Sequence, residues 1–409
     1  MADGLDTSST IVPKSGMGLY IHVPFCKTKC PYCDFNTYQG IEGLIGPYLE
    51  ALSTELVLWG RVLGRPTVNT VFLGGGTPSY LPGEHIGRIL AAAGSAFAID
   101  PQAEITIEAN PGDLDTDACC GLLSLGVNRL SIGVQSLDNG LLDLLGRRHD
   151  SGQAVEAFQT AREAGFSNIN LDLMYGLPRQ TLSQWQDTTK KLVSLSPGHI
   201  SLYCLTLEEG TPLHHWVRQG KLPEPDPDLA ADMYQYARES LADAGYHHYE
   251  ISNWSRPGLP ARHNLVYWRN QPYLGVGPGA HSRIGDYRFW DLDSPNAYML
   301  RVKQWEDSKP QPFDSFTGVE LDTVSPVGDR EHIGLDTRCA ETMILGLRLL
   351  DGMDLEQASA QAGADLQARF ASQIDELTGL GLLERTGSHL RLAEHAYLIA
   401  NQVFTRFVE

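Results

Sequence analysis

The chain has 409 residues, of which 42% are hydrophobic, and a formal net charge of −19. Its length predicts two or three domains, and because it contains no run of about 18 apolar residues, we expect no membrane-spanning helix. The acidic balance disfavours nonspecific binding to nucleic acid or to an anionic membrane surface.

The first 16 residues are mostly small and polar, and we expect residues 1–16 to form a flexible N-terminus. They lack the basic start and the apolar stretch of a secretory signal peptide. A cytoplasmic protein is therefore expected. A reducing compartment also keeps cysteine side chains available as thiolate ligands.

Between residues 17 and 205, short apolar runs alternate with longer amphipathic stretches. The predicted strands are Gly18–Val23, Thr70–Leu73, Glu104–Glu108, Arg129–Val134, Ile169–Met174 and His199–Leu205. The predicted helices include Tyr48–Leu63, Glu84–Ala96, Thr116–Leu125, Gln153–Ala164 and Leu182–Val193. This alternation predicts an α/β fold, a partial TIM-like (β/α)6 barrel of parallel strands. Functional side chains are then expected at the carboxyl ends of the strands.

The remainder of the chain divides into two parts. Residues 206–325 have a looser pattern, with one clear helix at Pro227–Ala244, and we interpret them as an extension of the barrel. Residues 326–409 are predicted to form an α+β, winged-helix-like domain. Its predicted elements are helices Thr337–Leu350 and Asp365–Leu380, a hairpin over residues 381–392, and a final helix Ala393–Phe407. Its mixed charges favour a lid or partner-docking role over DNA binding.

Three cysteines follow the first predicted strand with the spacing Cys26-x3-Cys30-x2-Cys33. Three thiolates on one short loop can hold three irons of a [4Fe–4S] cluster and leave the fourth iron open. A zinc site would need a fourth ligand at suitable spacing, and none follows closely. The loop resembles that of the radical S-adenosylmethionine (SAM) enzymes, and this resemblance implies SAM on the open iron.

Polar residues and glycines stand at the ends of the predicted strands. Glycines let a backbone approach a ligand closely, a carboxylate accepts hydrogen bonds from hydroxyl or amino groups, and an arginine pairs with a carboxylate. Taken singly, each of these residues is as well explained by a structural hydrogen bond, and each tyrosine by core packing. Together they line one mouth of the predicted barrel. The candidates are Tyr20, Tyr32, Gly75, Gly76, Thr77, Glu108, Gln135, Arg147 and Asp172.

These motifs resemble the oxygen-independent coproporphyrinogen III oxidase family over nearly the whole chain from about residue 17. They comprise Tyr20-x5-Cys26, Gly74-Gly-Gly-Thr-Pro78, Glu108-x-Asn-Pro111, Gly133-Val-Gln-Ser136 and Asp172-Leu-Met-Tyr-Gly-Leu-Pro178. The resemblance implies that the nine candidate residues contact SAM. It also implies a cellular electron donor.

One position departs from the oxidases, which carry a fourth cysteine two residues after the third. Here that residue is Phe35, so oxidase activity is doubtful, and whether the chain is an enzyme stays open. A further motif, His263-Asn264-x-x-Tyr267-Trp268, resembles the HemW branch of haem chaperones. This branch implies haem as cargo and haem-accepting partners that include membrane-bound respiratory enzymes.

His263 is the favoured haem contact, because an imidazole can ligate iron while Tyr and Trp rings pack on a porphyrin. The same motif can equally close a turn and fill a core. With 13 histidines in the chain, the axial ligand stays open. The alternatives to a haem chaperone are the oxidase and a degenerate fold that only docks partners.

Overall fold

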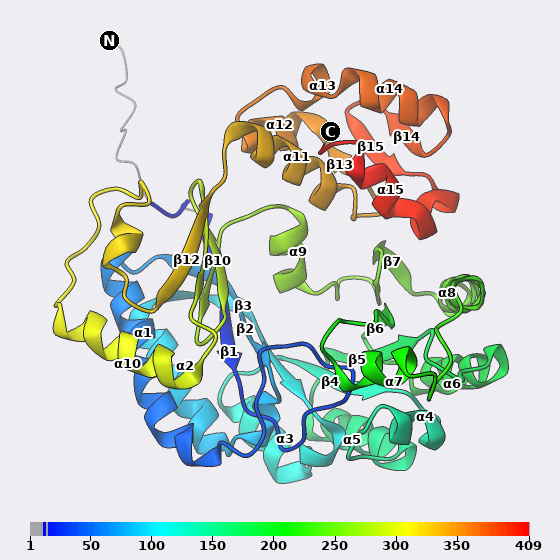
Figure 1. The fold of residues 1–409 in the computed structure, drawn as a ribbon, viewed down its shortest axis with the longest axis horizontal. Helices are drawn as coiled ribbons and strands as arrows, with labels where there is room; N and C mark the ends of the chain where they lie inside the picture. The colour runs from blue at the N-terminus through cyan, green and yellow to red at the C-terminus, as the bar shows by residue number, and fades with distance from the viewer. Residues whose placement is uncertain (1–10, 14, 409) are drawn as a thin grey trace.

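This computed structural model describes residues 11–13 and 15–408. In this part of the chain, twelve strands form one curved sheet (Figure 1). Six consecutive strands pair in parallel along its centre. They are β1 (Met17–Val23), β2 (Thr67–Gly75), β3 (Ala98–Ala109), β4 (Arg129–Gln135), β5 (Ile169–Tyr175) and β6 (His199–Cys204). The predicted α/β partial barrel is therefore confirmed, with its six strands in chain order.

Crossover helices cover the outer face of the sheet (Figure 1). They are α1 (Ile45–Val62), α2 (Gly83–Ala96), α3 (Thr116–Ser124), α5 (Ser151–Ala164), α6 (Leu182–Leu195) and α8 (Pro227–Asp243). Capping boxes at Asp150 and Thr181 start α5 and α6. The main core lies between helices and sheet, where Trp59 and Trp185 are fully buried.

The shorter elements lie in the connections. The helices are α4 (Asn139–Leu144), α7 (Pro212–Arg218), α9 (Arg262–Trp268) and α10 (Pro295–Asp307), and the 3-10 turns are Glu42–Leu44, Pro78–Tyr80, Pro111–Asp113, Glu320–Thr323 and Glu394–Ile399. None of the helices in the described part of the chain is both long and apolar enough to cross a membrane.

The predicted extension shares the sheet of the predicted barrel. Strand β9 (Tyr273–Val276) pairs in parallel with β1, and β10 (His281–Ile284) and β11 (Tyr287–Asp291) follow in antiparallel order. Strand β12 (Val327–His332), which lies just beyond residue 325, pairs with β11 and continues the same sheet. At the opposite edge, β8 (Asn253–Ser255) and β7 (His247–Glu250) follow β6. Runs of three to six residues carry too little periodicity to be placed in a sheet from sequence.

A separate C-terminal domain has its own apolar cluster and confirms the winged-helix-like prediction. Its elements are α11 (Leu335–Gly346), β13 (Met353–Asp354), α12 (Leu355–Ala362), α13 (Leu366–Arg369), α14 (Ala371–Gly379), β14 (Leu383–Thr386), β15 (His389–Leu392) and α15 (Ala400–Thr405). The predicted hairpin is confirmed. Two predicted helices are interrupted: Asp365–Leu380 breaks at Phe370, whose ψ is +22°, and Ala393–Phe407 begins as a 3-10 turn.

The predicted flexible segment, residues 1–16, lies mostly outside the described residues. Of its described part, Val12 is buried in the main core, and the Gly16 N–H donates to the Pro13 carbonyl.

Candidate functional site

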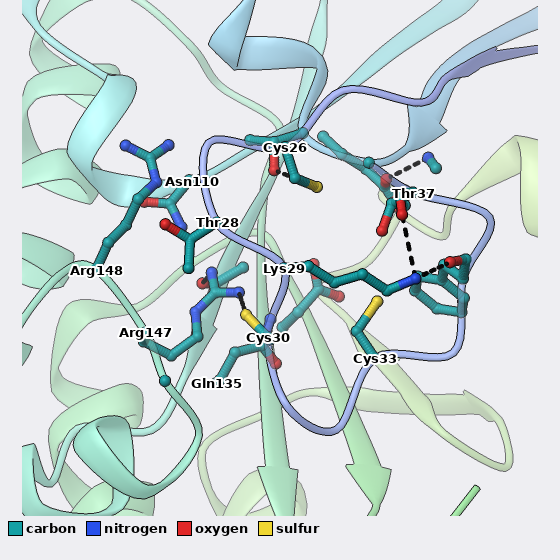
Figure 2. Close-up of a pocket in the computed structure, with 18 of the residues that line it drawn as sticks. Cys26, Thr28, Lys29, Cys30, Cys33, Thr37, Asn110, Gln135, Arg147 and Arg148 are labelled. Carbon is teal, nitrogen blue, oxygen red and sulfur yellow. Dashed lines mark hydrogen bonds between the residues drawn. The ribbon is translucent and has the colours of Figure 1, made fainter. Parts of the chain in front are cut away.

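The three cysteines lie on the loop that follows β1, and their side chains line one cavity at the carboxyl ends of the strands (Figure 2). The loop is closed on itself by two main-chain bonds, from the Cys26 N–H to the Tyr38 carbonyl (2.9 Å) and from the Tyr38 N–H to the Pro24 carbonyl (2.8 Å). The Lys29 ammonium adds bonds of 3.1 Å to the carbonyl oxygens of Phe35 and Thr37. The chain itself therefore holds the thiols in place.

Two of the three thiols lie beside polar side chains of the cavity wall. Among the described residues, no three His, Cys, Asp or Glu side chains converge as the ligands of one metal ion. The sulfurs of Cys26 and Cys30 lie 3.5 Å from the Thr77 hydroxyl and from an Arg147 guanidinium nitrogen, respectively. Burial raises the pKa of Cys26 and of Cys33, so iron binding would have to stabilise the thiolates.

Eight of the nine predicted SAM residues line this same cavity: Tyr32, Gly75, Gly76, Thr77, Glu108, Gln135, Arg147 and Asp172. The ninth, Tyr20, lies outside the cavity lining. Its hydroxyl is 3.0 Å from His22 Nδ1, and its ring stacks on Phe72. The strand ends therefore converge as the sequence predicts, and the contact of Tyr20 with SAM stays a prediction.

The glycine motif at the end of β2 anchors the cysteine loop. The N–H groups of Gly76 and Thr77 donate to the carbonyls of Val23 and Phe25 at 2.8 Å. Gly75 has a φ of +105°, and a Cβ there would lie 2.4 Å from the His22 ring. A Cβ on Gly76 would lie 2.6 Å from the Phe25 carbonyl oxygen. Glycine is therefore required at Gly75 by its backbone conformation, and at Gly76 by the close approach of the Phe25 carbonyl.

Two partly buried carboxyl groups, Glu108 and Asp172, line the cavity. Glu108 Oε2 accepts a 3.1 Å hydrogen bond from the Gly75 N–H. Burial, together with the charge of Asp172, raises the pKa of Glu108 to about 7. Burial also raises the pKa of Asp172, although Ser131 Oγ (2.8 Å) and Asn170 Nδ2 (2.9 Å) donate to its carboxylate. A cationic ligand placed beside these groups would favour their ionised forms.

The end of β4 presents Gln135 to the cavity through a distorted backbone. The pairing of β4 with β5 shifts register between Gly133 and Gln135, and Gln135 has a φ of +63°. A bulge of this kind redirects a side chain. A Cβ on Gly133 would lie 2.9 Å from Gln135 Nε2. Because non-glycine residues rarely adopt a positive φ, this strain at a cavity is typical of a ligand-binding position.

Arg147 also lines the cavity, and only some of its guanidinium nitrogens have hydrogen-bond partners. One terminal nitrogen donates to the Gly133 carbonyl at 2.7 Å, and the other lies 3.5 Å from both Cys30 Sγ and the Tyr32 hydroxyl. Its Nε is buried and has no hydrogen-bond partner among the described residues. A buried donor without a partner fits a site that is completed by a ligand such as a carboxylate.

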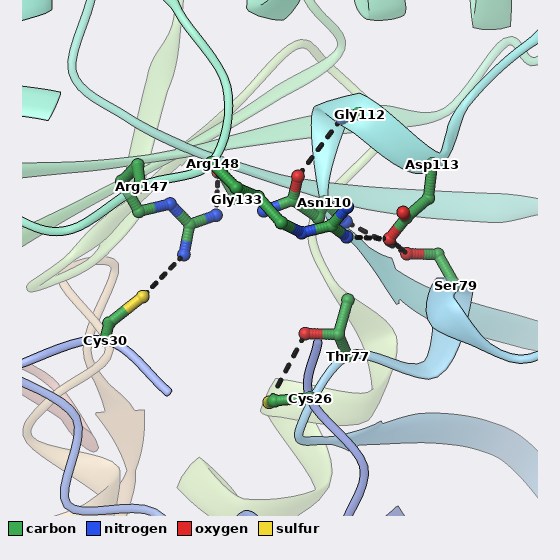
Figure 3. A network of polar contacts seen from close by, with 10 residues as sticks. All are labelled: Cys26, Cys30, Thr77, Ser79, Asn110, Gly112, Asp113, Gly133, Arg147 and Arg148. Carbon is green, nitrogen blue, oxygen red and sulfur yellow. Dashed lines mark hydrogen bonds and ion pairs between the residues drawn. The ribbon is translucent and has the colours of Figure 1, made fainter. Parts of the chain in front are cut away.

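Beside Arg147 lies a polar network that the sequence analysis did not assign (Figure 3). Arg148 forms an ion pair with Asp113. The same carboxylate accepts from the Ser79 hydroxyl at 2.9 Å, and that hydroxyl accepts from the Asn110 N–H at 3.0 Å. Asn110 and Arg148 both line the cavity. Their signal was present in the sequence, because Asn110 belongs to the Glu-x-Asn-Pro motif and Arg148 adjoins Arg147.

The predicted haem motif lies on α9, apart from this cavity. His263 is 1% exposed. Its Nδ1 lies 2.8 Å from the Thr70 hydroxyl, and its Nε2 lies 2.9 Å from the Tyr267 hydroxyl. Burial lowers the pKa of His263 to about 3, so the ring is neutral at physiological pH. In this conformation both ring nitrogens are occupied.

Trp268, at the end of the motif, contacts the C-terminal domain. Asn264 and Trp268 are partly buried. The Arg348 guanidinium lies over the Trp268 ring, 4.2 Å from its centroid. The motif thus extends from the barrel interior at Thr70 to the C-terminal domain at Arg348.

The fold and the cysteine-lined cavity define a radical SAM protein. Residues 20–192 match the model of the Radical SAM superfamily, and residues 334–399 match that of the HemN C-terminal domain. The chain is 37% identical to a protein named heme chaperone HemW from Mycobacterium tuberculosis, over 96% of this chain and 95% of that one. Its identity to HemW of Synechocystis is 36%, with 99% and 93% covered. The chain belongs to the HemW family.

Among solved structures, coproporphyrinogen III oxidase (HemN) from Escherichia coli matches with a TM-score of 0.80. The match covers 96% of this chain and 90% of that one at 24% sequence identity. At this identity the match shows that the fold is shared, including the C-terminal domain.

Proposed function

We propose that this chain binds haem and passes it to haem-dependent proteins, including membrane-bound respiratory enzymes, and that it carries a [4Fe–4S] cluster and SAM. Its place in the HemW family supports the haem role. The cavity supports the cofactors, because it gathers three thiols, two carboxyl groups and an incompletely bonded arginine. We place this protein in the cytoplasm, with a cellular electron donor.

The main reason to propose a chaperone rather than an oxidase is the identity of residue 35, which is phenylalanine. This residue lines the cavity, and its side chain is 64% exposed. It stands where the resembling oxidases have a fourth cysteine. A phenyl ring can neither ligate iron nor donate a proton, so the chain lacks the thiol that distinguishes the oxidases.

The chain's own residues define how the cofactors would be held. Cys26, Cys30 and Cys33 would hold the cluster. Arg147 would orient the carboxylate of SAM, and Glu108 would accept from its amino or ribose groups. When bound, the cluster would supply the electron that breaks a carbon–sulfur bond of SAM.

The barrel over residues 17–205, its extension over 206–325 and the domain over 326–409 remain our proposed division of the chain. Because the extension pairs with β1, we propose that the first two parts fold together.

Anaerobic reconstitution with iron and sulfide, followed by haem titration and a coproporphyrinogen turnover assay on the same sample, tests the proposal. We expect stoichiometric haem uptake without porphyrinogen turnover. Turnover with negligible haem affinity would establish the oxidase instead. A triple Cys→Ser variant at Cys26, Cys30 and Cys33 is the control for cluster absorbance.

A further inference from the structure

A second cavity, which we call the outer cavity, lies on the other side of the cysteine loop and has a volume of about 910 Å³. This volume is within the range of small-molecule sites. Thr28, Lys29 and Gly146 line both the outer cavity and the SAM cavity, so the cysteine loop separates the two. Helices α4 and α7 contribute to its other walls.

Part of the wall of the outer cavity is apolar. Leu141, Leu144, Trp216 and Leu222 line it and belong to a small apolar cluster that is separate from the main core. The Leu213 N–H donates to the Pro31 carbonyl at 2.9 Å, which fixes α7 against the cysteine loop. Leu144, Trp216 and Leu222 are only partly buried. Apolar side chains left open in a concave site favour binding of an apolar ligand.

Three cations line the outer cavity, and one of them, Lys29, already donates to main-chain carbonyls of the cysteine loop. Arg179 and Lys221 line the outer cavity and are exposed. An Arg179 guanidinium nitrogen lies 3.3 Å from the Lys221 main-chain carbonyl, so the two residues are neighbours. Among the described residues, neither side chain forms a salt bridge. In a chain of net charge −19, two adjacent cations without a carboxylate partner favour an anionic ligand.

Two carboxylates also line the outer cavity. Asp138 is engaged within the protein, where its carboxylate accepts from the Leu141 N–H (3.0 Å) and from Gln184 Nε2 (3.2 Å). Asp143 is exposed. The ligand must therefore direct its anionic groups to the Arg179–Lys221 side of the cavity.

We propose that the outer cavity is the haem-binding site, with the porphyrin ring against Trp216 and Leu144 and the two propionates toward Arg179 and Lys221. The inference rests on the proposed haem function and names its site. Among the described residues that line the cavity, none is His, Cys, Met or Tyr. The ring and the propionates, rather than an axial bond to iron, therefore provide the affinity. A site without an axial protein ligand suits a carrier, because release requires no iron–ligand bond to break.

Haem titration of the reconstituted full-length chain, with absorbance as the readout, tests the site. We expect the double variant Arg179→Glu/Lys221→Glu to bind haem at least tenfold more weakly. Arg218→Glu is the matched control: it reverses one exposed charge on α7 outside the cavity lining, and we expect its affinity to stay within twofold of the wild type. Trp216→Ala should also weaken binding at least tenfold, with the cluster absorbance unchanged.

Competition by metal-free protoporphyrin IX provides a second readout. We expect it to displace haem with an affinity within threefold of that of haem. A requirement for iron would overturn the site, because it would demand an axial ligand that the cavity lining lacks. Wild-type haem affinity in both the charge-reversal and Trp216 variants would also overturn it, while leaving the proposed function intact. Absence of haem binding by the wild type would refute the proposed function itself.

Discussion

At the scale of single residues, the SAM cavity depends on positions that admit no side chain. At Gly133, a Cβ would lie 2.9 Å from Gln135 Nε2 and 3.3 Å from an Arg147 nitrogen, which are the ends of two cavity side chains. The Arg147 side chain is held by its bond to the Gly133 carbonyl, and the Gln135 backbone has a positive φ. A methyl group at this position displaces the two side chains that we propose for SAM binding.

We therefore expect Gly133→Ala to weaken SAM binding at least tenfold while the cluster absorbance is retained. Equilibrium dialysis with SAM on the anaerobically reconstituted protein measures the effect. Gly121→Ala is the control, since a Cβ on this residue of α3 meets no atom within 4 Å. Equal SAM affinity in the two variants would contradict the role of Gln135 and Arg147.

Glu108 makes the stability of the folded chain depend on pH. Its pKa of about 7 in the folded chain is above the ordinary value for glutamate. The folded state therefore binds an extra proton in this window, and its stability falls as pH rises from about 4.5 to about 7. The full shift corresponds to about 3 kcal/mol.

We expect Glu108→Gln to remove much of this loss in the cofactor-free protein. Urea unfolding at pH 5.5 and pH 8 measures it: the difference in free energy of unfolding between the two pH values should shrink by about 2 kcal/mol in the variant. An unchanged difference would mean that Glu108 titrates normally.

At the scale of elements, α9 closes the inner side of the barrel. The His263 ring packs on Phe72 and bonds to Thr70, and both of these residues lie on β2. Tyr267 packs against Tyr273 of β9. The helix thus joins the central strands to the added strand β9, which gives the motif a structural role whether or not it also contacts haem.

We expect His263→Ala to lower the free energy of unfolding by about 3 kcal/mol, because it opens a cavity and leaves two buried hydroxyl groups without a partner. Tyr267→Phe removes one of these bonds and should cost about 1 kcal/mol. Denaturant unfolding measures both, and haem titration of the same variants should show unchanged affinity. A stable His263→Ala protein with weakened haem binding would restore His263 as the haem ligand.

At the scale of the whole molecule, the C-terminal domain docks on the barrel through an ion pair between a partly exposed arginine and a buried carboxylate. Glu250 at the end of β7 is fully buried, and Arg348 lies 3.3 Å from its carboxylate. The same guanidinium covers Trp268, and the Leu350 N–H donates to the Tyr249 carbonyl at 3.0 Å. One arginine therefore contacts both the sheet edge and α9.

We expect Arg348→Leu to destabilise the protein by about 3 kcal/mol, because it leaves a buried carboxylate without its cation. Hydrogen exchange should show faster opening over residues 334–399, with the SAM cavity unaffected. Arg369→Leu is the control: its partner Asp336 has a side chain that is 85% exposed, so its loss should cost less than about 1 kcal/mol. Equal effects of the two variants would argue against docking through Glu250.

The sequence by itself determined the order of the six parallel strands and the convergence of their ends. Hydrophobic periodicity identifies each strand, and parallel strands joined by crossover helices bring their carboxyl ends to one mouth. For this reason the amino-acid sequence alone was enough to assign Glu108, Gln135, Arg147 and Asp172 to one cavity. The spacing of the three cysteines is a local feature, so it could be recognised in the sequence without knowledge of the fold.

Only the tertiary structure decided the pairing of β9 with β1, the burial of His263 and the existence of the outer cavity. Each depends on contacts between segments far apart in the chain: Gly18 pairs with Tyr273, Thr70 meets His263, and Pro31 bonds to Leu213. Periodicity reports which residues are apolar along one segment. It carries no information about which distant segment covers them, and that is set by packing of the whole molecule.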